Sequence, residues 1–281
     1  MKLAVNTYSY ANARNEDGTP FSQFQMLEEA AKTGFDAVEI VGLLCGEGED
    51  PIAYAKKLAE KAKDCGIALA GYTTSADLLR DGEEERLKGE VDIAAALGVH
   101  FMRHDAAWSA PEGKTFEDVL PILAAKAKIV TAYAKERGVR TTTENHGYFV
   151  QDCERMVALL KAIDDPNFGL LCDVGNFMCA DEVSVNSVKT VAPYAIYVHA
   201  KDFMYLAKED VETPPPGYFP TRGGNYLRGA AIGDGVVNVK TCISILKDAG
   251  YDGFVSLEFE GPGDVLAEIR KGYGRLRDYI A

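Results

Sequence analysis

The chain has 281 residues, of which 47% are hydrophobic, and its formal net charge at pH 7 is −13. This length and composition suffice for the core of one large α/β barrel or of two ordinary domains, and they exclude a disordered chain. An acidic protein repels a phosphate backbone, because nucleic-acid affinity rests on lysine and arginine displacing counterions. Nucleic acid is therefore excluded as a partner.

The cysteines and the apolar runs bear on where the protein works. Six cysteines are scattered along the chain without a Cys-x-x-Cys pair, which is typical of reduced thiols. The first residues, "MKLAVNTYSYANARNEDG", contain no sustained apolar stretch, and no later run is long enough to cross a bilayer. We expect a soluble cytoplasmic protein without a membrane partner.

Short apolar runs recur every few dozen residues, and each begins with residues suited to a buried strand and ends with polar ones. In chain order they are "KLAVNTYSY", "AVEIVGL", "IALAGYT", "HFMRHDA", "RTTTENHG", "GLLCDVGN", "AIYVHAKD" and "FVSLEFE". Segments with helical spacing lie between them. One of these, "FSQFQMLEEAAKTG", has a capping box of Ser22 with Gln25 and a stop at Gly34, and "NVKTCISILKDAG" repeats the plan from Asn238 to Gly250.

About eight strand–helix units in a chain of this length predict an α/β fold, a (β/α)8 TIM barrel, as a single domain over residues 1–281. The alternative is an open doubly wound sheet, which the absence of a G-x-G-x-x-G after the first strand disfavours. The connection at about 203–233 breaks the rhythm, because it is rich in proline, glycine and aromatic residues. A loop of this length indicates a lid over the active site, with a passive insertion as the alternative.

The polar ends of four successive strands predict the site, because the carboxyl ends of barrel strands converge on one mouth. Three carboxylates and one imidazole at that mouth suit Mn²⁺, Mg²⁺, Co²⁺ or Zn²⁺, and hard oxygen ligands favour Mn²⁺ or Mg²⁺. Each residue alone has a simpler explanation, such as an Asx turn at Asp173 or a core histidine at His199. The residues at these ends are Glu144, His146, Asp173, Asn176, His199, Lys201, Asp202, Glu258 and Glu260.

The motifs "TTTENHG", "LLCDVGN", "YVHAKD" and "GYDGFVSLEFEG" resemble the sugar phosphate isomerase/epimerase family, the xylose isomerase-like TIM barrels. The resemblance covers nearly the whole chain and is densest from Arg140 onward. It implies one divalent metal, Mn²⁺ first among the candidates, bound by Glu144, Asp173, His199 and Glu258. It also implies that Glu144 and Glu258 move protons on opposite faces of a ketose through an enediolate, which is sensible chemistry for a metal and a positioned carboxylate.

The sequence departs from the epimerase pattern at two places. Asn176 stands where those enzymes usually have a histidine, and Tyr205 stands where they have an arginine. His146 and Lys201 point to the same mouth if strand alternation holds, so a base other than glutamate is available. Trp108, Arg103 and the strand-end residues Asn176, Lys201, Asp202 and Glu260 are the predicted substrate-binding residues.

The leading hypothesis is a metal-dependent isomerase or epimerase of a ketose-like sugar or polyol. A lyase or dehydratase of a keto-sugar, keto-glycoside or cyclitol, with His146 as the base, is the second. An endonuclease is disfavoured by the charge and by the presence of only four histidines. A non-catalytic sugar-binding barrel is disfavoured by the paired glutamates. The expected partner is a carbohydrate, unphosphorylated because no Gly-rich cradle accompanies the last strands, and self-association into a homo-oligomer stays open.

Overall fold

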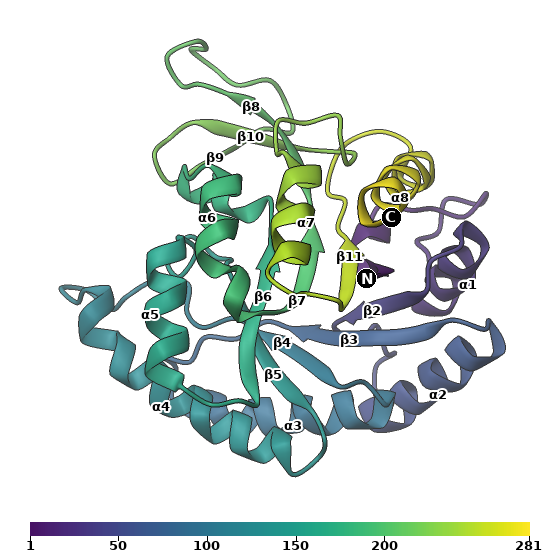
Figure 1. Cartoon of the computed structure of the whole chain (residues 1–281). Helices are drawn as coiled ribbons and strands as arrows, with labels where there is room; N and C mark the ends of the chain where they lie inside the picture. The colour runs from purple at the N-terminus through teal and green to yellow at the C-terminus, as the bar shows by residue number, and fades with distance from the viewer.

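The computed structural model describes residues 1–281 and contains a closed barrel of eight parallel strands surrounded by eight α-helices (Figure 1). The barrel order is β1-β11-β7-β6-β5-β4-β3-β2, and β1 pairs with both β2 and β11, which closes the sheet. The strands are β1 (Lys2–Asn6), β2 (Ala37–Val41), β3 (Ala68–Thr74), β4 (Phe101–His104), β5 (Arg140–Glu144), β6 (Phe168–Asp173), β7 (Ala195–Ala200) and β11 (Phe254–Leu257). The TIM-barrel prediction is confirmed, and the open sheet is wrong.

The helices alternate with the strands and cover the outside of the barrel (Figure 1). They are α1 (Gln23–Thr33), α2 (Pro51–Asp64), α3 (Glu83–Leu97), α4 (Phe116–Lys135), α5 (Cys153–Ile163), α6 (Ser184–Val191), α7 (Val239–Asp248) and α8 (Val265–Ile280). The predicted capping box of Ser22 and Gln25 is present, and Gly34 ends α1 in the left-handed conformation at φ 104°. Asn238 caps α7 through the N–H of Thr241, as predicted.

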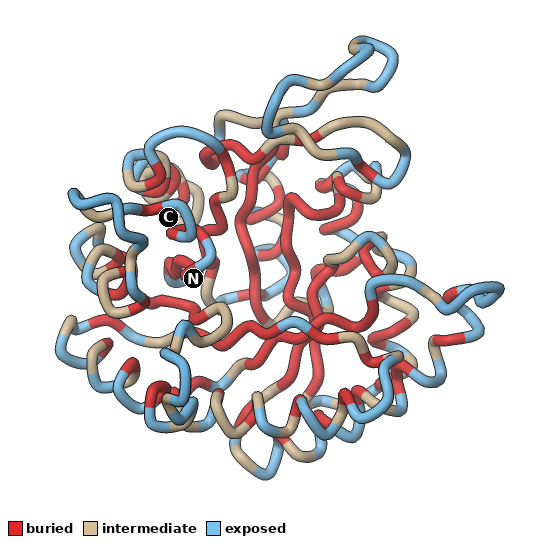
Figure 2. The backbone as a smooth tube through the Cα atoms, turned by 180° about the vertical axis from the view of Figure 1, so that it is seen from behind, coloured by how far each residue is buried: buried red, intermediate tan, exposed pale blue.

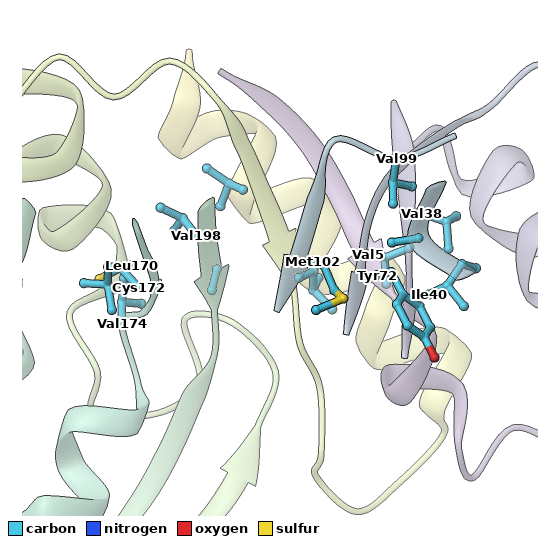
Figure 3. Packing of buried hydrophobic residues seen from close by; sticks show 14 of the residues in the cluster. Val5, Val38, Ile40, Tyr72, Val99, Met102, Leu170, Cys172, Val174 and Val198 are labelled. Carbon is cyan, nitrogen blue, oxygen red and sulfur yellow. The ribbon is translucent and has the colours of Figure 1, made fainter. Parts of the chain in front are cut away.

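Strand alternation sorts the side chains of the barrel into two sets. Outward residues join the main apolar core against the helices, and Figure 3 shows Val5, Val38 and Ile40 among them. Inward residues Ala4, Ala37, Ala70, Leu171 and Tyr197 form a separate buried apolar cluster inside the barrel. For four of these five residues, the residue two positions later in the same strand is polar and buried. These polar residues are Asn6, Glu39, Asp173 and His199. The barrel interior therefore has an apolar floor with a polar layer above it, toward the carboxyl ends of the strands.

The connection predicted as an irregular loop is instead an antiparallel sheet of three strands, in the order β8-β10-β9. We call residues 202–230 the arm; its strands are β8 (Asp202–Leu206), β9 (Phe219–Pro220) and β10 (Tyr226–Ala230). The arm rises beyond the carboxyl ends of the barrel strands, and its tip is exposed (Figures 1 and 2). Prolines and glycines obscured the strands in the sequence, because they crowd the turns and two of them, Pro220 and Gly229, lie within the strands themselves.

Two further observations concern the whole chain. All six cysteines are free thiols. None of the helices combines the length and the apolar character that a membrane-spanning segment requires.

Candidate active site

Four side chains from neighbouring strands converge inside the mouth of the barrel. Glu144 and Asp173 are the last residues of β5 and β6, His199 lies on β7, and Glu258 directly follows β11. One ligand atom of each residue lies within 4.8 Å of the ligand atoms of the other three. This is the set that the resemblance implied as metal ligands.

The donor atoms of this set fit a divalent metal. Asp173 uses Oδ1 to accept the backbone N–H groups of Gly175 and Asn176, at 2.7 and 3.0 Å, while its Oδ2 is buried without a hydrogen-bond partner. The Nδ1 atom of His199 is likewise buried without a hydrogen-bond partner, 3.1 Å from Glu258 Oε2. Asp173 is thus both an Asx-turn residue and a potential ligand. Buried polar atoms without partners are costly, and a coordinated cation would satisfy both.

Glu39 on β2 completes this cluster, and the sequence analysis missed it. Its Oε2 lies 2.8 Å from His199 Nε2, and Thr73 donates a 2.5 Å hydrogen bond to its Oε1. The contact occupies Nε2 and leaves Nδ1 facing the three carboxylates. A carboxylate within the apolar run "AVEIV", two positions after inward-facing Ala37, is the signal that could have revealed it.

Two buried cations hold the catalytic glutamates that the resemblance implied. Arg103 lies 2.8 Å from Glu144, and Lys201 lies 2.5 Å from Glu258. Asn6 adds a hydrogen bond to Glu258, also at 2.5 Å. Each glutamate is therefore already paired with a positive group before any substrate arrives.

The electrostatic environment gives two carboxyl groups of the cluster, Glu144 and Asp173, different pKa values. Burial raises the pKa of Glu144, but Arg103 and His199 outweigh burial and bring that pKa down to about 2. Burial raises the pKa of Asp173 to about 7, although Lys201 opposes the shift. Asp173 is the carboxyl group whose ionised form a bound cation would favour most.

His146 forms a second pair with Asp105, another residue that the sequence analysis missed although it stands in the run "HFMRHDA". The Nδ1 atom of His146 lies 2.9 Å from Asp105 Oδ1, and Arg103 lies 2.7 Å from the same oxygen. Burial raises the pKa of Asp105, but Arg103 and His146 lower it by more than burial raises it. The pKa of Asp105 therefore lies below the ordinary range. An ionised Asp105 accepts a hydrogen bond from Nδ1–H of His146, which leaves Nε2 as the free ring nitrogen.

A cavity of about 220 Å³ at the mouth is lined by three of the four candidate metal ligands, Glu144, His199 and Glu258, and we call it the metal cavity. Its lining includes Arg103, Glu144, His146, His199, Lys201, Glu258 and Glu260. Asn176 donates to Glu144 at 2.9 Å, and with Trp108 it lines an adjoining cavity. A larger cavity between the start of α6 and the arm contains none of the predicted site residues.

One residue predicted as a substrate contact, Asp202, lies outside both cavities. Asp202 is wrong as a substrate-binding residue, because its buried carboxylate accepts four backbone N–H groups, those of Phe203, Gly233, Gly235 and Val237. Its neighbour Lys201 points inward, so strand alternation turns Asp202 away from the mouth. His104, the neighbour of Arg103, is fully buried, with Nδ1 2.9 Å from the backbone oxygen of Asp105.

Comparison with known proteins decides the family. A model of the xylose isomerase-like TIM barrel family matches residues 27–279. The chain belongs to this family. The family resemblance read from the sequence is therefore confirmed, and the family includes epimerases, isomerases, dehydratases and decarboxylases.

Three similar proteins illustrate the range of the family. A 3-oxo-isoapionate decarboxylase of Pectobacterium atrosepticum is 27% identical over 74% of this chain and 71% of its own length. An inosose dehydratase of Clostridium perfringens is 26% identical over 92% of this chain and 90% of its own. The crystal structure of the IOLI protein with a bound zinc atom superposes with a TM-score of 0.76 over 100% of this chain and 98% of that one, at 18% identity.

Proposed function

We propose that this member of the xylose isomerase-like family is a metal-dependent lyase acting on a keto-sugar or a keto-cyclitol. The observation that supports it is the His146–Asp105 pair at the edge of the metal cavity. Glu144 and Glu258 are each held by a buried cation, whereas His146 is 35% exposed and keeps one ring nitrogen free. His146 is therefore the better placed general base.

Different residues of the site have different roles in the proposed reaction. Glu144, Asp173, His199 and Glu258 would hold a divalent metal, Mn²⁺ by our proposal, which when bound withdraws electron density from the ketone oxygen of the substrate. His146 removes the proton from the adjacent carbon through Nε2, and Asp105 stabilises the resulting imidazolium. A substituent on the next carbon then leaves with the electron pair of its bond. Lys201 and Glu260 bind substrate hydroxyls.

The names of the relatives support a lyase. A decarboxylase and a dehydratase both break a bond to a substituent near a carbonyl group, and both are similar to this chain along most of its length. Sequence identities of 26–27% leave the substrate open, so we extend only the reaction class to this protein.

An isomerase or epimerase is the second candidate. Glu144 and Glu258 both line the metal cavity, as two acid–base groups acting on opposite faces of a ketose would require. Their cation partners disfavour this alternative, because a carboxylate that is held ionised is a weak base.

Product mass distinguishes the two candidates. We expect the Mn²⁺-loaded protein, screened with ketoses, keto-glycosides and inososes, to release a product that is lighter than its substrate by the lost substituent. Replacing His146 by Gln should lower kcat by about 10²–10⁴-fold, the usual contribution of a general base, without changing the metal content. A product of unchanged mass, formed equally well by His146→Gln, would establish the isomerase instead.

A further inference from the structure

A second cavity of about 250 Å³ adjoins the metal cavity, and we call it the aromatic cavity. His146, Lys201 and Glu260 line both cavities, so the two meet at these three side chains. Each cavity alone is below the range of about 300–1,000 Å³ that is typical of ligand sites, and the two together fall within it. The space available to a substrate is therefore two compartments joined at His146.

Three aromatic side chains line the aromatic cavity. Trp108 and Tyr148 come from the loops after β4 and β5, and Phe219 comes from β9 of the arm. The backbone at Gly147 lies against Trp108, since an added Cβ there would be 3.1 Å from the indole ring. Trp108 is nevertheless 46% exposed, so part of its ring is free to contact a ligand.

The turn that carries Tyr148 is strained and tied to the arm. Tyr148 adopts φ 64°, a left-handed conformation that bulky side chains rarely adopt. Its backbone N–H donates to Gln151 at 2.6 Å, and its hydroxyl donates to the backbone oxygen of Pro220 at 2.7 Å. The first bond stabilises the loop after β5, and the second holds that loop against the arm.

The charged groups of the aromatic cavity, Lys201 and Glu260, lie at the junction, and the amides of Gln151 and Asn176 line the rest. Glu260 stands 3.7 Å from Lys201, and its side chain is 21% exposed. Trp108 lies edge-on to His146, with 5.2 Å between the ring centroids. Aromatic faces beside a carboxylate suit a ring that has apolar faces and hydroxyl groups at its rim.

We propose that the aromatic cavity binds a second, hydroxylated ring of the substrate, so that the substrate is a keto-sugar joined through oxygen to that ring. This inference rests on the proposed lyase function and specifies its leaving group. The ring is either a second sugar or a phenol, because both have the same apolar faces and hydroxyl rim.

The elimination takes place where the two cavities meet, beside His146. His146 takes the proton from the carbon beside the ketone, and the electron pair of that bond forms a carbon–carbon double bond. The bond between the β-carbon and the bridging oxygen breaks, and the oxygen keeps its electron pair. The His146 imidazolium returns the proton to that oxygen, so the second ring leaves as an alcohol or a phenol.

Trp108 is the only tryptophan of the chain, so its fluorescence reports on this cavity without requiring turnover. We would titrate the Mn²⁺-loaded protein with 4-hydroxyphenyl glucoside, cellobiose and methyl glucoside, none of which has the ketone needed for reaction. We expect a two-ring ligand to change the Trp108 emission and to bind at least tenfold more tightly, by calorimetry, than methyl glucoside. The stronger of the two responses identifies the second ring as a phenol or a sugar.

Phe219→Ala should remove that tenfold advantage, and Tyr205→Ala should keep it, because Tyr205 is on the arm but lines neither cavity. Equal binding of one-ring and two-ring ligands, with no change in emission, would overturn the inference. Elimination from free keto-sugars that depends on His146 would in that case leave the proposed function standing. Tight two-ring binding combined with a product of unchanged mass would overturn the proposed leaving group and the lyase together.

Discussion

The contact between Glu39 and His199 determines which ring nitrogen of the histidine faces the metal ligands. The Oε2 atom of Glu39 accepts a hydrogen bond from the Nε2–H group of His199, and both side chains are 1% exposed, so water does not compete for this bond. A carboxylate behind a metal-ligating histidine usually fixes its tautomer and its ring orientation. Glu39 is thus a positioning residue that acts through His199.

We expect Glu39→Gln to weaken metal binding about tenfold, the lower end of the usual effect, because the amide oxygen can still accept the Nε2 proton. Calorimetric titration of the metal-free protein measures this change. Glu60→Gln, at an exposed glutamate of α2, is the control and should leave the affinity unaltered. An unchanged dissociation constant in Glu39→Gln would contradict the assigned role.

Asp173 offers a sharper test of the ligand set. Asp173→Asn keeps an oxygen for the N–H groups of Gly175 and Asn176, so the turn and the fold should persist. It removes the negative charge at Oδ2, the oxygen of Asp173 that has no hydrogen-bond partner. We expect loss of bound metal by elemental analysis and loss of turnover, with an unaltered circular dichroism spectrum. Full metal occupancy in this variant would refute the site.

At the scale of elements, the arm is anchored to the barrel by Asp181. The Asp181 carboxylate accepts from Thr221 at 2.6 Å, from the N–H of Gly223 at 2.5 Å and from Asn225 at 2.8 Å. An added Cβ at Gly223 would lie 2.7 Å from this carboxylate, so the glycine is needed for the close approach. Gly223 is therefore held against the barrel and is not a free hinge.

The anchor should weaken in acid. Burial raises the pKa of Asp181, but the hydrogen bonds from Thr221 and Asn225 outweigh burial and lower it. A folded-state pKa below the unfolded one means that this contribution is complete above about pH 4, the ordinary range of aspartate, and is lost as the pH falls through the folded value. The NMR signal of the Gly223 amide should therefore shift with a midpoint below the ordinary aspartate pKa.

Asp181→Asn is the matching variant for the anchor. It should abolish the acid-dependent shift of the Gly223 amide and make the arm more sensitive to proteolysis at neutral pH. Metal content should not change, because Asp181 lies outside the metal cavity. A variant whose Gly223 amide still titrates like the wild type would assign the shift to another group.

Two deletions separate the functional part of the arm from its tip. Residues 209–216 are mostly exposed, and a short glycine–serine turn in their place should leave kcat/KM nearly unchanged. Removing 218–224 takes away Phe219 and two of the three Asp181 contacts, those of Thr221 and Gly223, and should lower kcat/KM by orders of magnitude while metal binding persists. Equal kinetics for the two deletions would show that the arm is passive.

At the scale of the whole molecule, stability depends on the apolar layer between the barrel and the helices. Leu123 and Ile122 are neighbours on α4, but Leu123 is fully buried and Ile122 is 48% exposed. Leu123→Ala should lower the free energy of unfolding by about 2–5 kcal/mol, whereas Ile122→Ala should change it by about 0.5 kcal/mol or less. Urea unfolding of both variants measures the difference, and similar values would indicate that α4 packs differently.

Much of this fold and part of the site could be predicted from the sequence, because the signals involved are local. The capping box at Ser22, the stop at Gly34 and the alternating strands depend on neighbouring residues only. Polar residues at successive strand ends fall at one mouth in any parallel barrel, which is why Glu144 and Asp173 could be predicted together. The arm was missed because its strands pair across an irregular turn.

The sequence by itself therefore determined the barrel, the ends of α1 and α7 and the kind of atoms at the mouth. Only the tertiary structure decided which of those atoms touch. Glu39 and His199 are 160 residues apart and come into contact only when the barrel closes. The pairing of Arg103 with Glu144, of Asp105 with His146 and of Asp202 with backbone N–H groups likewise depends on side-chain direction and on contacts between strands and loops. No local pattern encodes these contacts, since each joins segments that meet only through the packing of the whole chain.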